Sequence, residues 1–144
     1  MAITSKTIKY SIIIIGILGL LFIGAILFFI LYESKKDISK EEPYVSFLNK
    51  PQKLKAISTV RWHKDNLRFS HYSLEVNDDS YHNNEDVKSV KQYQPGDIIT
   101  FYAAKSYFSN HVGESFYLIA RDTLDTGEVI EFQYYYTPGA LPFD

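Results

Sequence analysis

Histidine and carboxylate side chains are the groups through which this chain could bind a metal ion. Its four histidines, His63, His71, His82 and His111, are dispersed, and none forms the i, i+4 helical pair or the short strand pair that zinc sites use. The segment 77–86 (NDDSYHNNED) gathers carboxylates around His82, but it lacks the central glycine and terminal glutamate of an EF-hand. We interpret it as a solvated acidic loop. We therefore expect no metal and no cofactor.

A second candidate for chemistry is Asp125-Thr126-Gly127, which matches the catalytic triplet of aspartic proteases. In those enzymes two aspartates share a proton and activate water, so a chain with one triplet would act as a dimer. Glu128 stands where that family usually has Ala or Ser. Asp and Gly are also the residues that a tight turn requires. We predict a turn here and no catalytic residue.

The segment Pro95-Gly96-Asp97-Ile98-Ile99 resembles the Gly-Asp-Ile/Val strand of signal peptidases, which are membrane-anchored β proteins. That family uses a nucleophilic serine, usually followed by Met, and a lysine base from a Lys-Arg pair. Here Ser80 and Ser89 are followed by Tyr and Val, and Leu118–Arg121 contains no lysine. Arginine cannot act as the base because it does not deprotonate in proteins. The resemblance is limited to these five residues, and we predict a turn that starts a strand.

Ile12–Leu31 is an unbroken run of 20 Ile, Leu, Phe, Gly and Ala residues. A helix of this length rises about 30 Å, the thickness of the hydrocarbon layer of a membrane. We predict a transmembrane helix at residues 10–32, preceded by a short cationic tail at residues 1–9. A cleaved signal peptide is the alternative, but its apolar core usually has about 7–15 residues, and no small-x-small cleavage motif precedes the charged residues after the run.

The charge distribution separates the two ends of the chain. From Glu33 to Asp144 there are 13 basic and 17 acidic residues, a net charge of −4, with no basic block. This argues against a nucleic-acid partner, whose phosphates require a concentrated positive face. The cationic N-terminal tail is similar to that of a signal anchor and indicates a cytoplasmic tail, although lysines after the helix make the charge rule nearly neutral. We predict that the C-terminal domain is extracytoplasmic, in the periplasm or outside the cell.

Two glycines of the predicted helix, Gly16 and Gly19, lie three residues apart and roughly share a face. Such a site would let a second helix approach closely, but the spacing differs from the four-residue small-xxx-small pattern. Glycine is also common in membrane helices that contact lipid alone. We name both residues as candidate partner contacts and leave a homo-oligomer open.

Beyond the helix we predict a stalk at residues 33–52 and a β domain at residues 53–144. In the stalk, Pro43 and Pro51 restrict any helix between them to a turn or two. The domain has runs with strand character at 54–62, 67–76, 98–104, 116–122 and 128–136. A short helix is a further expectation at residues 85–93, where Val87, Val90 and Lys91 fall at helical spacing.

These segments favour a small, mainly antiparallel all-β domain, a sandwich or small barrel of five to six strands. Both faces of the run 98–104 are largely apolar, which indicates a central strand covered on both sides. Alternation puts Phe101 and Ala103 on one of these faces and Tyr102 and Ala104 on the other.

The end of the chain is rich in aromatic residues. In the last strand Ile130, Phe132, Tyr134 and Tyr136 line one face, and Tyr135 points the other way. The tail at residues 137–144 carries Leu141 and Phe143. An exposed apolar tail either packs on its own domain or binds a partner. We name Tyr135, Leu141 and Phe143 as candidate partner contacts.

We expect a single-pass membrane protein that acts by protein–protein contact and not by catalysis, as an accessory or assembly subunit of a membrane complex. Its partners would be membrane lipid and the other subunits. The alternative is a membrane-tethered sensor that binds a small ligand or an ion in an aromatic-lined cavity near the loop 77–86. A divergent hydrolase is a third hypothesis, which would require a protonatable pair in a cleft, including Asp97 or Asp125.

Overall fold

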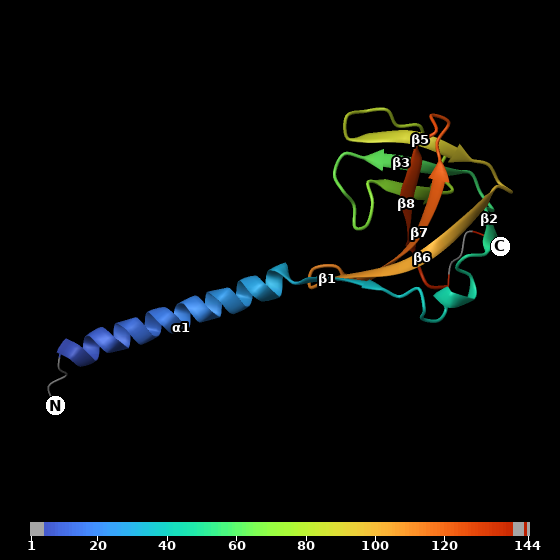
Figure 1. Ribbon diagram of the computed structural model, residues 1–144. Coiled ribbons are helices and arrows are strands. Elements are labelled where there is room, and N and C mark those ends of the chain that lie inside the picture. Colours follow the sequence, from blue (N-terminus) through green and yellow to red (C-terminus); the bar gives the residue numbers. More distant parts are fainter. Residues whose placement is uncertain (1–4, 140–142, 144) are drawn as a thin grey trace.

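The computed structural model describes residues 5–139 and 143. It contains one long helix, α1 (Ser5–Leu31), followed by a domain made mainly of β-strands (Figure 1). The span Lys6–Leu31 is fully exposed and is long and apolar enough to cross a membrane; a signal sequence near the N-terminus meets the same criterion. The helix begins at Ser5, before the expected start at residue 10. Lysine is a good helix former, so Lys6 and Lys9 allow the helix to extend beyond the apolar run.

The domain is built on one eight-stranded sheet with the order β1-β6-β7-β8-β4-β3-β5, and β2 pairs with β6 beyond β1. The strands are β1 (Glu33–Asp37), β2 (Pro51–Lys53), β3 (Ser58–His63), β4 (Tyr72–Val76), β5 (Val87–Tyr93), β6 (Ile98–Ser109), β7 (Gly113–Thr123) and β8 (Val129–Tyr136). A short 3-10 helix, Tyr44–Ser46, lies between β1 and β2. The described strand pairs are antiparallel, except that β4 and β8 are parallel.

The sheet bends so that strands far apart in its order meet around one core. Figure 1 shows β3 and β5 crossing β6 and β7 at a large angle. Lys91 on β5 donates a hydrogen bond to Asp122 on β7 at 2.6 Å, and the Tyr93 hydroxyl donates to the same carboxylate. We call Lys91, Tyr93 and Asp122 the clasp, because they join two strands that are not neighbours in the sheet.

The structure confirms an apolar N-terminal helix and a mainly antiparallel β domain, but the domain is larger than predicted, with eight strands instead of five or six. Two of the additional strands lie in the segment 33–52, which the sequence predicts to be a stalk. There β1 and β2 pair with the two ends of β6. Tyr44 and Leu48 of this segment are buried in the main core. Residues 33–52 are therefore part of the folded domain.

The third additional strand is β5, which replaces the short helix predicted at residues 85–93. Its main chain pairs with β3 from Val87, opposite His63, to Tyr93, opposite Ser58. A segment this short is a marginal helix by itself. The hydrogen bonds offered by the edge of β3 therefore outweigh the helical spacing of its valines.

β6 is a central strand, as the sequence predicts, with 12 residues between β7 on one side and β1 and β2 on the other. Its register with β7 shifts between Phe101 and Ala103, where a β-bulge leaves Tyr102 without an opposite residue. As a result Phe101 and Ala104 both belong to the main core, and Ala103 belongs to a second cluster. The strict alternation predicted from the sequence is therefore wrong beyond Phe101.

We call the face of the sheet that carries the main core the inner face. In the last strand Ile130, Phe132 and Tyr136 are buried there, as predicted. On the outer face a smaller cluster is formed by Ala103, Tyr107, Tyr117 and Ile119. The connection from β3 to β4, residues 64–71, covers this cluster: the ring centroids of Phe69 and Tyr117 are 5.4 Å apart, and the Arg68 guanidinium lies 4.1 Å from the Tyr107 ring.

The last described residue, Phe143, packs against its own domain. Its side chain is 3% exposed, and its ring centroid lies 5.3 Å from that of Phe101 and 5.8 Å from that of Tyr134. Its main chain forms an isolated bridge with Leu54. The sequence leaves two alternatives for the tail, packing on its own domain or binding a partner, and Phe143 packs on the domain. Leu141 lies outside the described residues.

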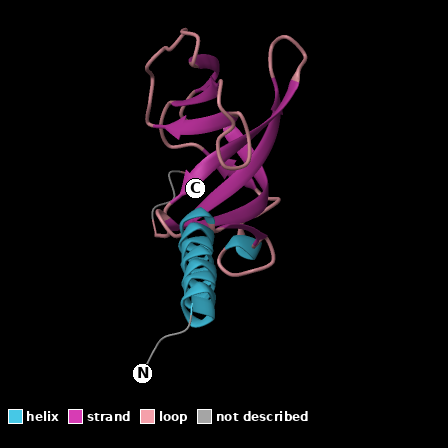
Figure 2. Cartoon of the chain, turned by 90° about the vertical axis from the view of Figure 1, so that its left-hand side faces the viewer, coloured by secondary structure: helices cyan, strands magenta, loops and turns pink. Residues whose placement is uncertain are grey.

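A single residue, Tyr32, connects α1 to β1. Its ring lies 5.8 Å from that of Phe28 in the helix and 6.2 Å from that of Phe108 in β6. The Asn110 side chain, in the turn after β6, donates a hydrogen bond to the Phe29 carbonyl. Figure 2 shows the helix joining the domain at one end of the sheet.

Candidate interaction site

The Asp125-Thr126-Gly127 triplet forms the turn between β7 and β8. The Gly127 amide donates to the Leu124 carbonyl at 2.8 Å, and the Leu124 amide donates to the Glu128 carbonyl at 2.8 Å. Gly127 has a φ of 85°, which glycine adopts without strain. Asp125 is exposed. The residue types of the triplet thus have the structural role that the sequence predicts.

Asp97 also has a structural role at the start of β6. Its carboxylate accepts a hydrogen bond from the Gln94 amide at 2.8 Å, and its own amide donates to the Gln94 carbonyl at 3.0 Å. Gly96, with a φ of 101°, donates its amide to the Leu54 carbonyl at 2.8 Å. The Pro-Gly-Asp motif therefore closes a turn and attaches it to the end of β2.

In the acidic loop 77–86, the first carboxylate, that of Asp78, binds other groups of the domain. Asp78 forms an ion pair with Arg61 at 2.6 Å and accepts hydrogen bonds from the amide and hydroxyl of Ser80. The Ser80 bonds are the main cause that lowers the pKa of Asp78. Among residues 5–139 and 143, no group of three or more His, Asp or Glu side chains is arranged to hold a metal ion.

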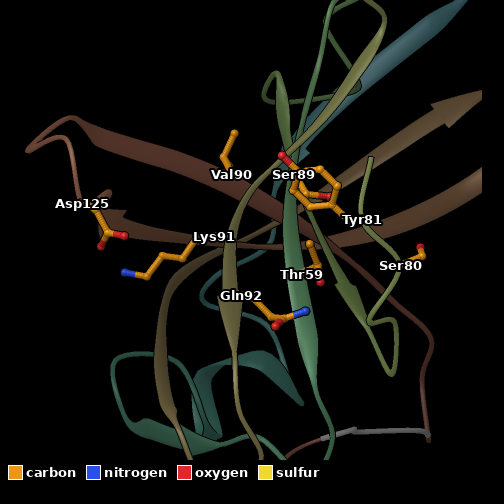
Figure 3. A pocket seen from close by; sticks show the side chains of 8 residues that line it. All are labelled: Thr59, Ser80, Tyr81, Ser89, Val90, Lys91, Gln92 and Asp125. Atoms are coloured by element: carbon orange, nitrogen blue, oxygen red, sulfur yellow. The ribbon is translucent and has the colours of Figure 1, made fainter. Parts of the chain in front are cut away.

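Beside this loop is a polar hollow of about 320 Å³ (Figure 3). Its lining residues are Thr59, Ser80, Tyr81, Ser89, Val90, Lys91, Gln92 and Asp125. Lys91 on its border already donates to Asp122 and to the Thr123 carbonyl, and the buried Thr59 hydroxyl donates to the Asp78 carbonyl. Lys91 and Thr59 therefore already have hydrogen-bond partners within the domain.

A second hollow, of about 420 Å³, opens between β4 and β8. We call it the tyrosine groove; its lining residues are His63, Leu67, Ser73, Leu74, Glu75, Val76, Tyr117, Gln133, Tyr134 and Tyr135. A neighbouring hollow of about 340 Å³ shares Leu67, Tyr117 and Gln133 with it. The volume of the tyrosine groove lies in the range of about 300–1,000 Å³ that is usual for ligand sites.

Two tyrosines in edge-to-face contact form one wall of the groove. Tyr135 on β8 lies opposite Tyr117 on β7 in the strand register, and their ring centroids are 5.5 Å apart at 70°. Tyr117 is buried, whereas Tyr135 is 58% exposed. An exposed aromatic ring on a fixed neighbour is the arrangement in which tyrosine contributes strongly to binding, because little side-chain entropy is lost.

The connection between β3 and β4, residues 64–71, forms the rim of the groove near Leu67. Hydrogen bonds attach this connection to β8. The Phe69 amide donates to the Gln133 side chain at 2.8 Å, and the Ser70 hydroxyl donates to the Glu131 carbonyl. These bonds attach residues 64–71 to the strand that carries Tyr135. The groove is therefore formed in the free chain.

The opposite wall carries the hydrogen-bonded chain His63, Ser73 and Glu75. The Ser73 hydroxyl donates to Glu75 at 2.8 Å, and the His63 Nε2 atom lies 2.9 Å from the same hydroxyl oxygen. Because the hydroxyl has one proton, the histidine donates in this chain and does not accept the serine proton. Burial lowers the pKa of His63, against the opposing effect of Glu75. These hydrogen bonds hold the polar wall in place, and the Glu75 carboxylate is the negatively charged group on it.

The candidate contacts predicted from the sequence do not come together. Tyr135 lines the groove, Phe143 is buried in the core, and Gly16 and Gly19 lie on the exposed helix with open space around them. Phe143 is therefore covered by its own domain in the free chain. Glu75 is not predicted as a contact from the sequence, and His63 is considered there only as a metal ligand; the alternation of Ser73 and Glu75 with apolar residues is a signal for one polar face.

Comparison of the chain with family models, with curated proteins and with solved structures finds no match. The geometry of the groove and of the helix is therefore the basis for a functional proposal.

Proposed function

We propose that this chain is a single-pass membrane protein whose extracytoplasmic β domain binds another protein through the tyrosine groove, as an accessory or assembly subunit of a membrane complex. The observation that carries the proposal is the pair Tyr117 and Tyr135, one buried and one 58% exposed, at a hollow of about 420 Å³. Tyrosine is enriched at the residues that dominate binding in protein interfaces. The apolar helix supports membrane attachment by its length and composition.

The proposal is tested by affinity purification of the full chain from its native membrane in mild detergent. We expect a partner that co-purifies at fixed stoichiometry. Tyr135→Ala should weaken the complex about thirtyfold, which corresponds to ~2 kcal/mol for a central interface tyrosine. Tyr81→Ala is the matched control, because Tyr81 is 76% exposed and lies beside the other hollow. A chain that purifies alone, or a complex that both substitutions leave equally stable, would contradict the proposal.

A sensor for a small ligand or an ion remains the second candidate, favoured by the hollow beside the loop 77–86. It predicts that a ligand or divalent cation raises the melting temperature of the full chain. If neither metabolite mixtures nor divalent cations change the melting temperature, the sensor hypothesis is wrong.

A further inference from the structure

The tyrosine groove coincides with a split in the sheet. The parallel strands β4 and β8 pair only at Tyr72 with Phe132 and at Ser73 with Gln133. Beyond these pairs, Leu74–Val76 remain paired with β3, and Tyr134–Tyr136 remain paired with β7. The two strands thus separate from each other, and the groove occupies the space between them.

Among the described residues, each of these two segments has one main-chain edge that no other strand pairs with. In the described part of the chain, the main-chain groups of Leu74–Val76 and Tyr134–Tyr136 form no hydrogen bond apart from those to β3 and β7. A row of unpaired N–H and C=O groups is a template for pairing with another chain. Here two such rows border the same groove, which distinguishes it from an ordinary sheet edge.

The groove has a charge preference as well as a shape. Of its lining residues, Glu75 carries the formal negative charge, and it is held in place by the Ser73 hydroxyl. Tyr117, Tyr134 and Tyr135 line the same hollow. A carboxylate next to aromatic faces favours a lysine or arginine side chain, which gains both an ion pair and a cation–π contact.

We propose that the groove binds an extended segment of the partner protein, which adds as a strand to the open edges of β4 and β8 and places a lysine or arginine beside Glu75. This inference rests on the proposed function and specifies the form of the partner. Each open edge is three residues long, so about 10 Å of an extended segment, at ~3.3 Å per residue, lies in the split. The main chain of the segment supplies affinity and its alternate side chains supply specificity, as in other cases of strand addition.

The test uses the full chain in detergent micelles and synthetic peptides as probes. One peptide has valine and threonine alternating around a central lysine; the others carry alanine or glutamate at the centre, and a fourth is the lysine peptide methylated on alternate amide nitrogens. Hydrogen–deuterium exchange measures the protection of the amides in both open edges. We expect the lysine peptide to protect those amides of Leu74–Val76 and Tyr134–Tyr136 that face the split, and the methylated peptide to bind at least tenfold more weakly.

Two variants separate the charge from the fold. Glu75→Gln keeps the shape of the side chain, and we expect it to weaken the lysine peptide about tenfold and to leave the alanine peptide unchanged. Tyr81→Ala should bind all peptides as the unchanged chain does. Far-UV circular dichroism of both variants verifies that the domain is folded.

Three results would overturn strand addition: no peptide bound at millimolar concentration, protection confined to one of the two strands, or equal binding of the methylated and unmethylated peptides. If the native partner nevertheless co-purifies and depends on Tyr135, the proposed function stands and only its strand-addition form is wrong. If the native partner is also lost, both are wrong.

Discussion

Asp122 accepts hydrogen bonds from two side chains of a distant strand. The Lys91 ammonium lies 2.6 Å from its carboxylate, and the Tyr93 hydroxyl donates to the same oxygen. Partial burial opposes ionisation of Asp122, but the bonds from Lys91 and Tyr93 outweigh it and hold its pKa below the usual value. Burial and the Asp122 carboxylate together raise the pKa of Tyr93. Asp122 therefore stays ionised through the neutral range.

Asp122→Asn removes the charge and keeps the shape of the side chain. We expect it to lower the free energy of unfolding at pH 7 by about 1–3 kcal/mol, the usual cost of losing a hydrogen bond to a charged group. Because the pKa of Asp122 is lower in the folded state, its contribution is present above the unfolded pKa of 3.8 and is lost as the pH falls through the folded pKa. The difference between the two chains should therefore shrink in strong acid.

Urea denaturation at pH 7 and at pH 2.5 measures this effect. Asp125→Asn is the control, because Asp125 lies in the exposed turn a few residues away, and it should change stability by less than ~0.5 kcal/mol. Equal stability of Asp122→Asn and the unchanged chain at pH 7 would show that the clasp contributes nothing.

The strands that could be predicted from the sequence are the central ones. β6, β7 and β8 have a buried face and strong turn residues at their ends, so their alternation is clear. The missed strands β1 and β5 are the two ends of the sheet order, with the sequences ESKKD and VKSVKQY. An edge strand is half exposed and usually carries lysine, so its apolar pattern is weak. β2 is only three residues long.

The groove could be predicted only in part. Tyr135 follows from the alternation of the last strand, because it points away from the core. The split does not, since it depends on a parallel pair between β4 and β8, whose partners Tyr72 and Phe132 are far apart in the sequence. No local pattern encodes where such a pair ends. The bulge at Tyr102 escaped prediction for a similar reason, because its register is set by β7.

Phe143 tests how strongly the end of the chain is attached to the domain. Its ring packs on Phe101 and Tyr134 and is 3% exposed. We expect Phe143→Ala to lower the free energy of unfolding by about 3–5 kcal/mol, the usual cost of replacing a buried phenylalanine. Chemical denaturation measures it, with the exposed Tyr81→Ala as the aromatic control. A loss of less than ~1 kcal/mol would show that this contact adds little to the core.

The molecule as a whole combines an exposed apolar helix with a domain of net charge −4, counted from Glu33 onward. An apolar surface of this size requires lipid or another protein to cover it. The domain lies at one end of this helix, so a membrane-spanning helix would place the whole sheet on one side of the bilayer.

The absence of cysteine from the sequence makes this arrangement measurable. Single cysteines are introduced as Thr126→Cys, in the exposed turn before β8, and as Lys6→Cys, at the start of α1. For an extracytoplasmic domain, a membrane-impermeant maleimide should label Thr126→Cys in intact cells and Lys6→Cys only after detergent is added. The reverse pattern would place the domain in the cytoplasm. Loss of the helix from the mature chain, seen by mass spectrometry, would identify a cleaved signal.

The one-residue junction at Tyr32 has a consequence for direction. Tyr32 packs on both Phe28 and Phe108, and Asn110 binds the Phe29 carbonyl, so these contacts connect the orientation of the domain to that of the helix. Each helical residue advances the rotation by about 100°. In a membrane-spanning chain, inserting one residue into α1 would therefore swing the groove by roughly a quarter turn around the membrane normal. The rotation of the helix about its own axis thus determines the direction in the membrane plane from which a neighbouring protein reaches the groove.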